Sequence, residues 1–131
     1  MLDIRLIRRD PDLVRDSLAR RGASGELDQV IALDEQCRAL RTEVEAMRAE
    51  SGRIAKAIGQ AKKAGEDVAG STEDEARALR EQTSAKEDAL RAAEEQRDAV
   101  LLALPNLAQD DAPDGGEDDA VEIRRVGEPP A

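Results

Sequence analysis

Residues 30–61 read VIALDEQCRALRTEVEAMRAESGRIAKAIGQA, and this stretch decides the fold. Its mostly apolar seam positions recur at alternating steps of three and four residues, which is the a/d repeat of a coiled coil. The stretch therefore predicts one long helix with an apolar stripe that needs a partner. The seam consists of Val30, Leu33, Cys37, Leu40, Val44, Met47, Ser51, Ile54, Ile58 and Ala61.

A second stretch with the same repeat follows at residues 76–104, where the chain reads ARALREQTSAKEDALRAAEEQRDAVLLAL. If the chain folds back near residue 68, the residue numbers in each layer add to 137, and an a position always faces a d position. The two stretches therefore predict an antiparallel helical hairpin. Its layers include Cys37–Val100, Val44–Ala93, Met47–Leu90, Ile54–Thr83 and Ile58–Leu79.

Charged residues beside the seam support the same register. Opposite charges face each other at positions whose residue numbers add to 135, namely Arg41–Glu94, Arg48–Glu87 and Lys62–Glu73. Exposed pairs contribute only about 0–1 kcal/mol each, so they select the register more than they stabilise it.

Three seam positions of the second stretch hold a polar or charged residue where an apolar one is expected: Thr83, Lys86 and Arg97. Lys86 faces Ser51 and makes a polar layer in the middle of the hairpin. Either the lysine stem snorkels out of a locally weak seam, or this layer bends the hairpin or locks its register.

The composition excludes several classes of protein. The chain has 131 residues, no aromatic residue, no His, a single Cys and a net charge of −10. His-based catalysis and His-containing metal sites are excluded, a thick globular core is not expected, and the charge disfavours a protein that coats nucleic acid. We expect Cys37 to be a small core residue and the location to be cytoplasmic, without a signal peptide or membrane span.

The N-terminal residues predict a short lead-in to the hairpin. Leu2, Ile4 and Leu6 alternate with polar residues, which predicts an extended segment. Asp10 and Pro11 then predict the start of a short helix at about residues 10–21, which Gly22 ends. The apolar face of this helix is expected to comprise Leu13, Val14 and Leu18, and to pack at the base of the hairpin near Leu27, Ile31, Leu101 and Leu104.

The long helices are expected at about residues 26–64 and 72–104, with Thr72 and Glu75 as a capping box and Pro105 as the stop. Residues 1–104 would form one helical domain, and residues 105–131 an irregular acidic linker. Val121, Ile123 and Val126 could form a short strand, which suggests a further domain beyond the linker. The predicted fold class is all-α: a long antiparallel two-helix coiled-coil hairpin, a short N-terminal helix packed at its base, and this C-terminal linker.

The candidate binding residues lie near the turn of the hairpin. The window 51–65 contains Arg53, Lys56, Lys62 and Lys63 and no acidic residue. These cations either form a solvated helix face or contact the phosphates of a nucleic acid. Without aromatic residues, an RNA contact would use shape, phosphates and 2′-hydroxyls, not base stacking. Lys62 is the weakest candidate because Glu73 can neutralise it.

No catalytic constellation, phosphate loop or metal-ligand spacing is recognised, so the expected catalytic, cofactor and metal residues are none. The six acidic residues between Asp110 and Asp119 either solubilise the linker or bind divalent cations weakly.

Several motifs resemble one known family in their order and spacing. They are the opening Met1-Leu2-Asp3 with Asp10-Pro11-Asp12-Leu13-Val14-Arg15, then Leu33-Asp34-Glu35, Lys56 with Ile58-Gly59, Lys62-Lys63 with Gly65-Glu66-Asp67, Leu104-Pro105-Asn106-Leu107 and Gly127-Glu128-Pro129. Together they resemble the N-terminal tRNA-binding arm of seryl-tRNA synthetases.

The resemblance implies an arm that lies between the long variable arm and the elbow of serine tRNA and orients its acceptor end. ATP, Mg²⁺ and the class II serylation site would belong to a catalytic domain beyond residue 131, through which the parent enzyme forms a homodimer. The chain itself would be a non-catalytic monomer. The alternatives are a free-standing coiled-coil adaptor that binds a protein, and a catalytically dead paralogue of the synthetase.

Overall fold

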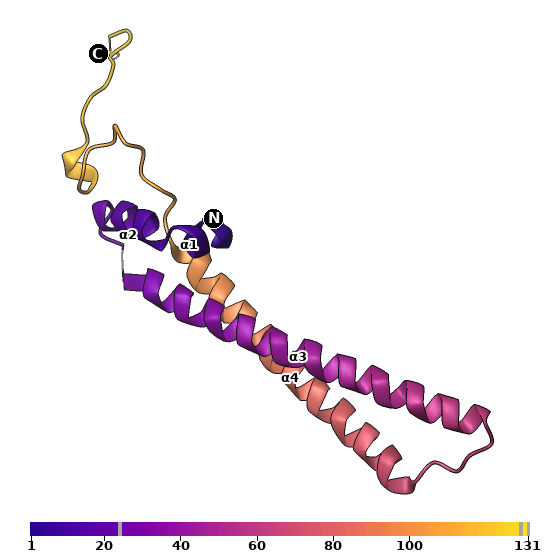
Figure 1. Ribbon diagram of the computed structural model, residues 1–131. Helices are drawn as coiled ribbons and strands as arrows, with labels where there is room; N and C mark the ends of the chain where they lie inside the picture. Colours follow the sequence, from indigo (N-terminus) through magenta and orange to yellow (C-terminus); the bar gives the residue numbers. More distant parts are fainter. Residues whose placement is uncertain (24, 129, 131) are drawn as a thin grey trace. The chain divides into compact units, whose positions relative to one another are not determined.

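The computed structural model describes residues 1–23, 25–128 and 130. These described residues form four α-helices and one short 3₁₀ helix (Figure 1). Their bounds are α1 Ile4–Arg9, α2 Pro11–Arg20, α3 Gly25–Lys63, α4 Gly70–Ala103 and η1 Glu117–Asp119. The predicted all-α class is confirmed, and the predicted strand at residues 121–126 is wrong, because the described residues there form no strand.

The chain divides into two compact units. Met1–Ile31 and Val100–Ala131 form the first, called here the terminal unit, and Ala32–Ala99 form the second, called the hairpin unit. The long helices α3 and α4 contribute to both units.

The extended segment predicted at the N-terminus is instead the helix α1. Asp3 caps this helix, since its carboxylate accepts a hydrogen bond of 2.8 Å from the Arg5 amide. Arg8 and Arg9 lie in the last turn, where cations complement the helix dipole. Leu2 and Ile7 are buried, and Ile4 and Leu6 pack against the same core. The alternation therefore marked residues that face the core, but it did not report the helical conformation.

Helix α2 begins and ends as predicted. The Asp10 carboxylate accepts a hydrogen bond of 3.1 Å from the Leu13 amide, and Pro11 occupies the first helical position. At the other end, Gly22 adopts a φ of +67° and the Ala23 amide bonds the Leu18 carbonyl at 2.9 Å. This is a Schellman motif, in which glycine adopts the left-handed conformation without strain.

The core of the terminal unit forms around the buried face of α2. Val14 and Leu18 are completely buried, whereas Leu13 is 50% exposed, so its predicted place on the apolar face is wrong. The predicted packing partners are confirmed: Leu27, Leu101 and Leu104 belong to the same buried cluster, and Ile31 packs against it. This core anchors α2 to both long helices within the unit.

Helices α3 and α4 of the hairpin unit pack in the predicted register. All the seam positions of this unit are buried or half-buried. The predicted ion pairs Arg41–Glu94, Arg48–Glu87 and Lys62–Glu73 all form. Figure 1 shows the two helices side by side, joined by the turn after Lys63. Cys37 is 1% exposed, and burial raises the pKa of its thiol, as expected of a neutral core residue.

The turn between the long helices begins with a second Schellman motif. Gly65 has a φ of +72°, and the Glu66 amide bonds the Ala61 carbonyl at 2.9 Å. Helix α4 then starts at Gly70, two residues before the predicted start. The Thr72 amide already bonds the Ala69 carbonyl at 2.9 Å, so Thr72 lies inside the first turn and the predicted capping box is wrong.

The three polar seam residues of α4 find hydrogen-bond or ion-pair partners in different ways. Lys86 snorkels out of the seam to Glu43, with 2.6 Å between Nζ and Oε2. The Thr83 hydroxyl donates to the Leu79 carbonyl at 2.7 Å. Arg97 reaches Asp34 at 3.3 Å, and the two side chains are only 13% and 6% exposed. The Arg97–Asp34 pair is therefore a buried ion pair that the seam pattern did not predict.

Candidate nucleic-acid interface

The structure separates the four predicted cations into two kinds. Arg53, Lys56, Lys62 and Lys63 all lie in the last three turns of α3 and are all exposed. What distinguishes them is whether a carboxylate already compensates the charge.

Arg53 and Lys62 have carboxylate partners. The Arg53 guanidinium contacts both oxygens of Glu50, with Nε–Oε2 at 2.9 Å and Nη2–Oε1 at 2.5 Å. The hydrogen bond from Arg53 lowers the pKa of Glu50, so this pair stays ionised. Lys62 contacts Glu73 at 3.0 Å, as predicted. Glu50 lies just outside the acid-free window 51–65. The window therefore did not show that a carboxylate compensates the charge of Arg53.

Lys56 and Lys63 are the uncompensated cations of this face. The described residues place no carboxylate within ion-pair distance of either ammonium group. The two lysines are seven residues apart, or about two helical turns, so they point to the same side of α3 about 10 Å apart. Both occupy the heptad position farthest from the a/d seam. Together they present two positive charges on the outer surface of the hairpin unit.

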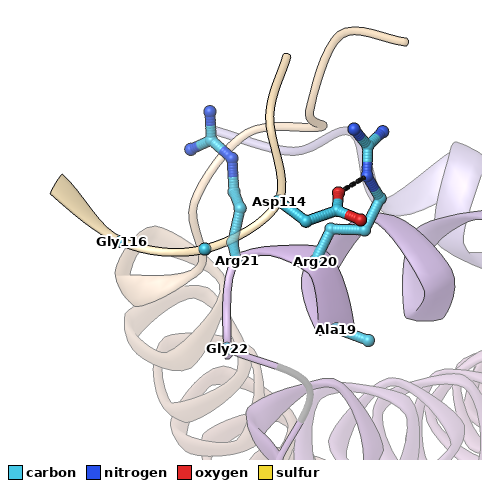
Figure 2. A pocket seen from close by; sticks show the side chains of 7 residues that line it. Ala19, Arg20, Arg21, Gly22, Asp114 and Gly116 are labelled. Atoms are coloured by element: carbon cyan, nitrogen blue, oxygen red, sulfur yellow. Dashed lines mark hydrogen bonds and ion pairs between the residues drawn. The ribbon is translucent and has the colours of Figure 1, made fainter. Parts of the chain in front are cut away.

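A hollow lined by two arginines lies in the terminal unit, at the C-terminal end of α2 (Figure 2). It holds about 660 Å³, and Arg20, Arg21 and Asp114 are among its lining residues. Arg20 Nε donates to Asp114 at 2.5 Å, and its Nη2 donates to the Ala112 carbonyl at 2.6 Å. Arg20 therefore holds the linker, and the negative end of the α2 dipole disfavours an anion here.

The described residues of the acidic linker do not assemble a metal site. Across the described residues, no group of three or more carboxylate or thiol side chains is placed to hold a metal ion. Nor is any described helix long and apolar enough to cross a membrane.

These features define a class: an all-α domain in which a two-helix coiled coil carries exposed cations near its turn. Residues 1–108 match the family described as the seryl-tRNA synthetase N-terminal domain. The chain belongs to this family.

Relatives confirm the assignment. The serine–tRNA ligase of Pseudomonas fluorescens is 39% identical over 132 aligned residues, covering all of this chain and 31% of that protein. The serine–tRNA ligase of Chloroflexus aurantiacus is 45% identical over 130 residues, covering 98% of this chain and 30% of that protein. The seryl-tRNA synthetase of Pyrococcus horikoshii, solved in complex with ATP, is 33% identical with a TM-score of 0.81 over 97% of this chain and 29% of that one. The chain thus spans about three tenths of the relatives it matches.

Proposed function

We propose that this chain is the tRNA-binding arm of a serine–tRNA ligase and that Lys56 and Lys63 contact the phosphate backbone of the tRNA. The observation that carries the proposal is the pair of uncompensated lysines on the outer face of α3, in a chain that belongs to the synthetase family. Arg53 and Lys62 contribute less, because binding RNA must compete with Glu50 and Glu73.

Two glycines beside these lysines support the proposal. Gly52 and Gly59 lie inside α3, where each costs up to about 1 kcal/mol relative to alanine. A Cβ added at either position would meet nothing within 4 Å, so the fold does not require glycine there. Both precede an uncompensated lysine by four residues and therefore lie one turn away on the same side of the helix. A bare backbone at these points allows close approach of an RNA strand.

The chain recognises RNA by shape and backbone. It has no aromatic side chain on which a base can stack, and its net charge of −10 opposes sequence-independent binding at long range. The partner is therefore a serine tRNA, whose long variable arm and elbow the hairpin engages. The arm orients the acceptor end for ATP-dependent serylation in the cytoplasm.

The catalytic chemistry belongs to a class II domain outside these residues, which also forms the homodimer. ATP and Mg²⁺ would bind there, since the described residues of this chain offer neither a metal-ligand cluster nor a phosphate loop. The chain itself is a non-catalytic monomer.

The turn of the hairpin does not support the adaptor alternative. A protein-binding tip should expose an apolar patch, but Val68, the one large apolar residue of the turn 65–70, is half-buried.

The test compares two double variants that remove the same amount of charge. Lys56→Ala with Lys63→Ala removes the uncompensated pair, and Arg53→Ala with Lys62→Ala removes the compensated pair. Each is titrated by filter binding across salt concentrations with two transcripts, a serine tRNA and the same tRNA lacking its variable arm. Removing one lysine–phosphate interaction lowers the salt slope by up to about 1, so the slope should fall by up to about 2 in the first variant and clearly less in the second.

Equal affinity of the wild-type chain for both transcripts would overturn recognition of the variable arm. An unchanged salt slope in the Lys56, Lys63 variant would overturn the assignment of these two lysines.

A further inference from the structure

The ion pairs along one edge of the hairpin unit form a regular series with one member missing. Arg41–Glu94 and Arg48–Glu87 are one heptad apart, and Lys62–Glu73 lies two heptads beyond the second pair. In each, α3 supplies the cation and α4 the carboxylate. The heptad in between places Ala55 opposite Arg80. There, α3 supplies no charge and α4 supplies a cation in place of a carboxylate.

A hollow lies at this interrupted position, between α3 and α4 of the hairpin unit. Its volume is about 330 Å³, and its lining combines small side chains with cations. The small side chains leave the space that a charged pair fills elsewhere along the edge. The lining includes Ser51, Ala55, Ala76, Lys62, Arg77 and Arg80.

The charge of this hollow is carried by Arg80. Lys62 is compensated by Glu73, which also lines the hollow, and Arg77 lies at 3.9 Å from Asp74, the outer limit of an ion pair. Among the described residues, no carboxylate lies within ion-pair distance of Arg80. An exposed guanidinium over a concave surface is suited to a phosphate, because its planar donors bind phosphate oxygens in pairs.

We propose that this hollow binds one backbone phosphate of the tRNA, with Arg80 as its principal ligand and Arg77 as a second donor. The inference rests on the proposed function and extends it from α3 to α4. Ala55 lines the hollow and directly precedes Lys56 in α3. The hollow and the outer face that carries the lysines are therefore neighbouring surfaces of this helix. The RNA strand therefore crosses the edge of the hairpin instead of following one helix.

Two variants test the proposal in opposite ways. Arg80→Ala removes the ligand, whereas Ala55→Glu supplies the missing carboxylate and so engages Arg80 within the protein. Both should weaken binding of the serine tRNA transcript by about tenfold at low salt, the effect of removing one charge-assisted hydrogen bond. Ala55→Glu should leave the thermal midpoint of the chain unchanged or raise it, because it completes the series of ion pairs.

Matched controls separate this site from a general charge effect. Arg91→Ala removes an arginine of the same helix that is paired with Asp88 at 3.5 Å, and Ala92→Glu adds an equal negative charge on an exposed position of α4. Both should bind RNA within about twofold of wild type, less than the effect of one charge-assisted hydrogen bond.

If Ala92→Glu weakens binding as much as Ala55→Glu, or if Arg80→Ala binds normally, the site is refuted. Loss of binding in the Lys56, Lys63 variant beside normal binding in Arg80→Ala would reject this inference and retain the proposed function. Normal binding in both would reject both.

Discussion

The buried Arg97–Asp34 pair offers the sharpest test of how the hairpin is held in register. We consider Arg97→Met, which keeps most of the apolar stem and removes the guanidinium. Asp34 then remains 6% exposed and loses a hydrogen bond that spans the two helices at 3.3 Å. Asp98, the other partner of Arg97, is half-exposed and becomes hydrated instead.

The expected cost follows from these exposures. Breaking a fully buried ion pair costs about 3–5 kcal/mol, and losing a hydrogen bond to a charged group about 1.5–3 kcal/mol. Asp34 keeps its other interactions, so we expect about 2 kcal/mol. For a chain of 131 residues this lowers the thermal midpoint by roughly 6–10 °C.

The companion variant replaces the whole pair by apolar residues, Arg97→Met with Asp34→Leu. Substituting both partners of a buried pair is often neutral, so the double variant should lie within about 1 kcal/mol of wild type. The single variants should therefore be strongly non-additive. Thermal and urea unfolding are followed by circular dichroism at 222 nm, because the chain has no Trp or Tyr for fluorescence.

If Arg97→Met unfolds at the same temperature and urea concentration as the wild-type chain, the reasoning is refuted, since the ion pair would then contribute nothing to the free energy of unfolding. A double variant as unstable as the sum of its single changes would show that the two residues act independently.

Two further predictions concern the seam and the linker. Leu90→Ala should destabilise the chain by about 2 kcal/mol, the low end for leucine truncation because Leu90 is half-buried, and an unchanged urea midpoint would place Leu90 outside the seam. Arg20→Ala should speed cleavage by endoproteinase Asp-N at Asp110–Asp114 several-fold, since Arg20 bonds Asp114 and the Ala112 carbonyl. Arg21→Ala is the control, and equal cleavage rates in the two variants would show that Arg20 does not hold the linker.

The candidate site was predictable as a region but not residue by residue. The acid-free window located the basic end of α3, and the register identified Glu73 as the partner of Lys62. The pairing of Arg53 with Glu50 was missed, although a spacing of three residues on a helix is a sequence-level signal. Arg80 was missed as well. The acidic residues near the start of α4 suggested that its cations are compensated, but the α3 position opposite Arg80 is Ala55, which carries no charge.

The sequence by itself determined the hairpin and its register. A heptad repeat specifies which side of each helix is buried, and only one alignment of the two repeats pairs a with d positions and opposite charges together. It also specified both ends of α2, since an Asp-Pro start and a glycine end act through neighbouring backbone groups. Such signals are local and periodic, and can be read without knowing the rest of the structure.

The tertiary structure alone decided the conformation of α1, the exposure of Leu13 and the burial of Arg97 against Asp34. A run of six residues has too few turns to distinguish a helix from a strand by periodicity. Whether a charged seam residue snorkels, as Lys86 does, or pairs inside, as Arg97 does, depends on where the carboxylates of the other helix lie. These outcomes depend on distances between side chains far apart in the chain, which only the packing of the helices determines.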